Sequence, residues 1–204
     1  MRRAPLRIDP SDLALEIVSI VIAIVLATAV GELVEHVRAQ ARTHEALVQI
    51  RQEIVADDAG LRRNATLHRN VWNAFRDAVT RARGHRMDFD EFAATFARSA
   101  PHGLRPFVGS TTAWDLARTS TVLADVPYDV RATIQRRYAE LDGLRDTNAI
   151  VLAHLENAPA EEHPNFYFTA VALVLSLADV VYSEQRLAAD DAAALRALDA
   201  AGAR

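Results

Sequence analysis

The sequence is defined first by what it lacks, which is cysteine and lysine. None of its 204 residues is cysteine, so disulfides, thiolate nucleophiles and cysteine-ligated metals are excluded. All 23 basic residues are arginine. Together with the abundance of alanine, this is typical of the codon bias of a GC-rich bacterial genome. The lack of cysteine is compatible with either redox compartment and does not indicate a location.

Charge runs and catalytic motifs are also missing. The net charge is −4, from 23 basic and 27 acidic residues without a long block of one sign, which argues against a nucleic-acid partner. The seven histidines are scattered, and Glu32, Glu35 and His36 do not form an E-x-x-H pair of the diiron type. No nucleophile elbow or phosphate loop occurs. We therefore predict no enzyme, cofactor or metal, although a site assembled only by folding stays open.

What the chain does contain is a long hydrophobic run, Leu13–Val34. Its two uncharged polar side chains, Ser19 and Thr28, lie on opposite faces of a helix, so there is no solvent-facing stripe. A helix over this run would rise roughly 30 Å, the thickness of the hydrocarbon core of a bilayer. We predict a short flank over residues 1–12, a transmembrane anchor over 13–34 and a helical domain over 35–204.

Two alternatives for this run stay open. In a cleaved signal peptide, Ala27-Thr28-Ala29 would be the cleavage site. Acidic Asp9, Asp12 and Glu16 and the absence of a helix breaker before the alanines favour the uncleaved anchor. The other alternative is a buried helix of a soluble core, which leaves an all-round apolar surface near the chain end unexplained.

Arginine placement predicts the orientation of the anchor. Arg2, Arg3 and Arg7 precede it, whereas Arg38 and Arg42 follow it. The positive-inside rule then favours a cytoplasmic N-terminus. The expected location is the inner membrane, in a single pass, with the bulk of the chain in the periplasm.

The remainder reads as an all-α, up-and-down helical bundle continuing from the anchor. Apolar residues recur at three- and four-residue steps, and no strand-like alternation appears. Asp88 and Glu91 form a capping signature before a short helix, Phe89–Arg98. Turn signals mark the expected breaks, which are Gly84-His85, Ser99–Ser110, Asp125–Pro127 and Ala158–Pro164.

The final helix, expected from about Asn165 to Leu198, is apolar enough over Phe166–Tyr182 to be considered as a second span. Its polar residues, however, fall on one line. A second span would also place Asp179 inside the membrane at appreciable cost. We therefore predict a largely buried bundle helix.

Two groups of residues are candidate interaction sites. Ser19, Ala23, Ala27 and Gly31 recur every four residues along the anchor, as in small-residue faces where membrane helices pack. This face predicts a homo-oligomer or docking to another membrane protein, unless it is only a product of alanine-rich composition.

Trp114, Tyr128 and Tyr138 form the second group, which we expect in the aromatic core of the bundle. The functional alternative is a ligand pocket floored by Trp114 and the tyrosines.

Three features occur together in the sequence: the apolar span Glu16–Val30, the step Ile50-Arg51-Gln52-Glu53-Ile54, and a later pattern of Ala113-Trp114, Ala117, Leu123 and Tyr128. In these features the chain resembles a group of small bacterial membrane-anchored helical proteins of unknown function. The resemblance covers most of the chain through loose, structural motifs. It implies one N-terminal membrane anchor and an otherwise helical fold, and it implies no activity.

Together these features predict a membrane-anchored helical interaction or scaffolding protein without catalytic activity. Its expected partners are the lipid bilayer and either a second copy of the chain or another membrane protein. The alternative is a ligand-binding, sensor-like bundle that signals through a membrane partner. A polar cavity among the helices would favour the alternative, and a dry core with an exposed apolar patch would favour the protein partner.

Overall fold

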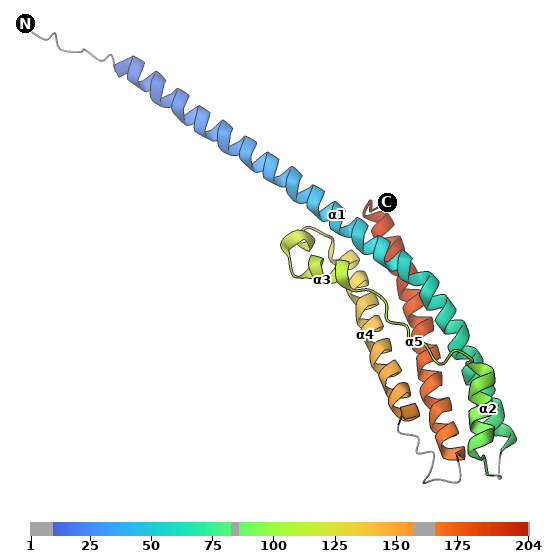
Figure 1. Ribbon diagram of the computed structural model, residues 1–204. Helices are drawn as coiled ribbons and strands as arrows, with labels where there is room; N and C mark the ends of the chain where they lie inside the picture. The colour runs from blue at the N-terminus through green and yellow to red at the C-terminus, as the bar shows by residue number, and fades with distance from the viewer. Residues whose placement is uncertain (1–9, 83–85, 157–165, 204) are drawn as a thin grey trace, which may run out of the picture. The chain divides into compact units, whose positions relative to one another are not determined.

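The structure is a computed structural model that describes residues 10–82, 86–156 and 166–203. Regular structure in these ranges is entirely helical, which confirms the predicted all-α class. The elements, labelled in Figure 1, are α1 (Pro10–Arg81), α2 (Phe89–Ser99), α3 (Thr112–Arg118), the 3-10 turn η1 (Thr121–Leu123), α4 (Tyr128–Glu156) and α5 (Tyr167–Ala200).

By their contacts, residues divide into two compact units, Met1–Thr43 and His44–Arg204, and α1 contributes to both. The predicted end of the anchor at Val34 rests on hydropathy, whereas the division after Thr43 rests on contacts between residues. The two boundaries therefore describe different properties of α1. Each unit is described by itself below.

In the first unit, every residue from 19 to 38 is exposed. This part of α1 is long and apolar enough to cross a membrane, and none of its most apolar 18-residue window is buried. The hydroxyl of Thr28 donates to the carbonyl of Ile24 at 2.9 Å, which satisfies that polar group within the helix. No residue of that window is buried against other described residues, which favours the anchor over a buried core helix.

The second unit is a bundle built from the later part of α1 with α2, α4 and α5. Helices α4 and α5 pack against each other, and α5 also packs against α1 (Figure 1). The predicted three- and four-residue periodicity places the large aliphatic side chains inside, because that spacing keeps them on one helix face. The fully buried ones include Ile50, Ile54, Leu61, Ile134, Leu141, Leu144, Leu173, Leu177 and Leu187.

The short helix α2 closes one end of the core with aromatic rings. Phe92 lies 5.2 Å from Phe75 of α1 and 5.5 Å from Phe166, measured between ring centroids. The predicted cap is confirmed, because the carboxylate of Asp88 accepts from the backbone N–H of Glu91 at 2.8 Å.

The expected breaks at Gly84-His85 and Ala158–Pro164 lie outside the described residues. Helix α1 ends at Arg81, α4 ends at Glu156 and α5 begins at Tyr167. Residues 100–111 form the non-helical connection that the turn signals predict.

Helix α5 is a packed bundle helix, as predicted. Its buried face includes Leu173, Leu177 and Leu187, and it also holds two carboxylates, Glu184 and Asp191. A second, apolar stripe on α5 is exposed, and it consists of Phe168, Leu175 and Tyr182 at seven-residue spacing.

Candidate ligand-binding groove

The site begins with Glu53 on α1, which holds the connection between α2 and α3 in place. One oxygen of its carboxylate accepts from the hydroxyl of Ser110 at 2.7 Å and from the backbone N–H of Ala113 at 2.9 Å. The other oxygen accepts from the hydroxyl of Tyr138 on α4 at 2.7 Å. Burial raises the pKa of Glu53, but these hydrogen bonds and the charge of Arg137 outweigh it, so the net pKa is lowered.

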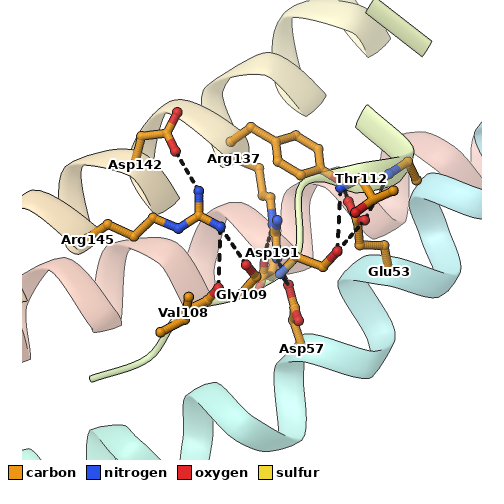
Figure 2. A network of polar contacts seen from close by, with 12 residues as sticks. Glu53, Asp57, Val108, Gly109, Thr112, Arg137, Asp142, Arg145 and Asp191 are labelled. Carbon is orange, nitrogen blue, oxygen red and sulfur yellow. Dashed lines mark hydrogen bonds and ion pairs between the residues drawn. The ribbon is translucent and has the colours of Figure 1, made fainter. Parts of the chain in front are cut away.

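Arg137 lies at the centre of the neighbouring cluster and is 0% exposed. Its Nε donates to Asp191 of α5 at 2.7 Å, and its Nη2 donates to Asp57 of α1 at 3.0 Å (Figure 2). Its guanidinium also lies 4.6 Å from the centroid of the Tyr138 ring. Burial alone would lower the pKa of Arg137, but the two carboxylates raise it, so the side chain stays charged. Its two ion pairs join α4 to α1 and to α5.

The connection passes so close to this cluster that a side chain at position 109 would force its neighbours to shift. A Cβ on Gly109 would lie 2.9 Å from a carboxylate oxygen of Asp57 and 3.0 Å from side-chain atoms of Leu141 and Phe107. Arg145 of α4 donates to the carbonyl of Gly109 from the other side (Figure 2). The backbone here is therefore fixed between α1 and α4.

Beside this fixed connection, α3, η1 and one face of α4 line a groove with a volume of about 820 Å³. This volume falls within the usual range for small-molecule sites. The rings of Trp114 and Tyr138 stack in its lining, with centroids 5.2 Å apart and planes 5° from parallel. The groove therefore combines an aromatic surface with polar side chains.

Three arginines line the groove, and two of them have carboxylate partners. Arg118 pairs with Asp115 at 2.8 Å, and Arg145 pairs with Asp142 at 3.0 Å. The third, Arg131, forms no ion pair with any side chain that the structure describes. Its Nε is buried without a hydrogen-bond partner.

The predicted aromatic group divides between core and groove. Tyr138 is buried and Trp114 is half-buried, but Tyr128 is 78% exposed, so its assignment to the core is wrong. Tyr128 is the first residue of α4 and lies on the helix face that borders the groove. All three aromatic residues line the groove, which is the arrangement of the alternative prediction.

The predicted packing face lies in the first unit, apart from the groove residues in sequence. Ser19, Ala23, Ala27 and Gly31 are all exposed, and a Cβ added to Gly31 would meet nothing within 4 Å. Association through this face stays a prediction.

The sequence analysis did not predict the cluster of Arg137, Asp57 and Asp191, although the sequence contains an indication of it. Arg137 lies between Ile134 and Leu141 in the apolar phase of α4, and Asp191 follows Leu187 in the phase of α5. A charge in the apolar phase of a helix indicates a buried partner, because an unpaired ion in a core is expensive. Which carboxylate pairs with Arg137 depends on the fold.

Comparison of the chain with known protein families, with curated proteins and with solved structures finds no match. The groove is therefore interpreted from its own residues.

Proposed function

We propose that the protein is a membrane-anchored helical bundle that binds a small ligand in the groove between α3, η1 and α4 and signals through a membrane partner. The observation that carries the proposal is the composition of the groove, where a stacked Trp114–Tyr138 pair and an unpaired Arg131 line a cavity of about 820 Å³. The aromatic pair is the part of this lining that is typical of ligand sites, because their walls are rich in aromatic side chains.

Binding, and not catalysis, is the function that these side chains favour. The hydroxyl of Tyr138 donates to Glu53, and burial followed by this hydrogen bond raises the pKa of Tyr138 well above its usual range. A phenol held protonated in this way is a poor base. The carboxylates of Asp115 and Asp142 are already engaged by arginines. The proposal is therefore of a non-enzymatic protein.

The apolar segment of α1 supports the membrane part of the proposal. Its most apolar window has no buried residue, and a bilayer would cover it. We place the N-terminus in the cytoplasm and the bundle in the periplasm, on the arginine asymmetry of the flanks. Glu53 and Asp57, which contact Tyr138 and Arg137, belong to the same helix as this segment, and we propose that ligand binding is signalled through that helix.

An interaction or scaffolding role is the second candidate, and one observation favours it. Phe168, Leu175 and Tyr182 form an exposed apolar stripe on α5 with the seven-residue period of helix–helix contacts. If this stripe carries the function, Leu175→Glu should abolish capture of a membrane partner while groove variants leave capture intact.

The ligand is tested by isolating the intact protein from membranes in mild detergent and identifying the small molecules released on denaturation by mass spectrometry. Ala132 lines the groove, so Ala132→Trp should fill it. Ala149 is an exposed residue of α4 that does not line the groove, which makes Ala149→Trp a matched control. We expect a molecule that is retained by the wild type and the control and lost from Ala132→Trp. Identical release from all three proteins would contradict ligand binding in the groove.

A further inference from the structure

We infer that the groove is built for an amphipathic organic monocarboxylate, with the carboxylate on Arg131 and the apolar body against the Trp114 side. This inference rests on the proposed function, since it names the class of ligand that the groove takes.

The charge of the groove is the first argument. Asp115 and Asp142 each neutralise one arginine of the lining, so Arg131 is left as its one unpaired cation among the described residues. The Nε of Arg131 is itself buried, so a ligand in the groove would meet the outer edge of the guanidinium. The two Nη groups of that edge together bind a carboxylate through two parallel hydrogen bonds.

The number of charges favours a monoanion. A phosphate monoester carries close to two charges at neutral pH, and it would find a single unpaired arginine in a groove that also contains Asp115 and Asp142. A carboxylate matches the one unpaired cation and leaves both existing ion pairs intact.

Other side chains of the groove supply the surface that would contact the apolar body of the ligand. Tyr128, Arg131 and Gln135 lie three and four residues apart on α4, and therefore on one helix face. Trp114 of α3 and Leu123 of η1 also line the groove. A ligand held at Arg131 thus has aromatic and aliphatic surface beside its charged end, which is the reason for expecting an amphipathic molecule.

The test uses the full-length protein in lipid nanodiscs and a matched pair of probes, 4-phenylbutyrate and its uncharged amide, 4-phenylbutyramide. Phenyl phosphate is the third probe. Binding is followed by the fluorescence of Trp114 in a Trp72→Phe background, because the chain has two tryptophans. We expect the acid to bind about tenfold or more tightly than either the amide or the phosphate, as one charge-assisted bidentate contact would give.

Variants at two arginines of α4 assign the effect. Arg131→Gln should weaken binding of the acid about tenfold or more, and Arg131→Lys, which keeps the charge but loses the fork, should weaken it less. Arg136 is exposed and does not line the groove, so Arg136→Gln should bind the acid like the wild type. Unchanged thermal melting of the Arg131 variants shows that a loss is local.

Three results would overturn the inference. These are equal binding of acid and amide, tighter binding of phenyl phosphate, and no binding of the acid in the millimolar range. Each leaves the proposed function to be decided separately, because a retained molecule that Ala132→Trp loses would still show that the groove binds a ligand of another class.

Discussion

Within residues 10–82, 86–156 and 166–203, two stretches are long and apolar enough to cross a membrane, and they differ in how far protein covers them. In the first, on α1, none of the most apolar 18-residue window is buried. In the second, on α5, 39% of the corresponding window is buried. Both stretches are long and apolar enough to cross a membrane, yet only the one on α5 is partly covered by protein.

Charged residues in the apolar phase mark the covered helix. Glu184 of α5 lies 2.7 Å from the Nδ1 of His68 on α1, and Asp191 of α5 pairs with Arg137 of α4. These contacts fix α5 within the bundle. The run Leu13–Val34 has carboxylates only near its ends, at Glu16 and Glu32. Ions with protein partners are typical of a bundle helix, and ions confined to the ends are typical of a membrane segment.

The largest predicted effect comes from placing one charged residue in each of the two stretches. Leu177 of α5 is 1% exposed, so Leu177→Asp should destabilise the bundle by about 4 kcal/mol or more, measured by thermal melting. Val25→Asp in α1 should leave the melting temperature unchanged and instead weaken membrane attachment, measured by carbonate extraction. The reverse pattern would mean that the two environments are assigned the wrong way round.

The next effect tests how α5 is held. Arg137→Met removes a buried cation and leaves Asp57 and Asp191 without it, which should cost about 3–5 kcal/mol of unfolding free energy. Arg136→Met, on the exposed side of α4, is the control and should change stability by less than about 0.5 kcal/mol. Equal stabilities of the two variants would show that the ion pairs of Arg137 do not hold α5 in the bundle.

The sequence could predict the helical class and the phase of the core, because periodicity depends on local spacing. It could also predict the cap at Asp88, where donor and acceptor are three residues apart. It placed Tyr128 in the core because aromatic residues are usually buried, whereas the start of α4 borders the groove. The joining of Glu53, Tyr138 and Ser110 depends on three segments far apart in the chain, which no local pattern encodes.

A smaller effect concerns pH and the connection beside the groove. The net pKa of Glu53 is lowered in the folded protein, so its contribution to stability is complete above its ordinary value of 4.5 and is lost as the pH falls through the lowered value. Glu53→Gln should cost about 1–2 kcal/mol at neutral pH through weakened hydrogen bonds. The difference in unfolding free energy between wild type and Glu53→Gln, measured by chemical denaturation, should narrow as the pH falls below 4.5. A difference in unfolding free energy that widens in acid would contradict the conclusion that Glu53 is stabilised in its ionised form.

The smallest effect sharpens what the exposed stretch of α1 contacts. If Ser19, Ala23, Ala27 and Gly31 form a packing face, Gly31→Ile should weaken self-association by about 1 kcal/mol in a membrane two-hybrid assay. Ile24→Phe, pointing elsewhere on the helix, should be tolerated. Loss in both variants would indicate disturbed insertion, and loss in neither would leave the small residues as a product of composition.

The most direct test of the central claim, that lipid covers the bare stretch of α1 while protein packs against α5, uses the absence of cysteine from the chain. Val25→Cys and Leu175→Cys, both at exposed positions, are each labelled with a nitroxide in the full-length protein in liposomes. Electron paramagnetic resonance then measures collision of the label with oxygen, which concentrates in lipid, and with a water-soluble nickel complex. The account predicts high oxygen and low nickel accessibility at position 25, with the reverse at position 175. Nickel accessibility at position 25 equal to that at position 175 would contradict it.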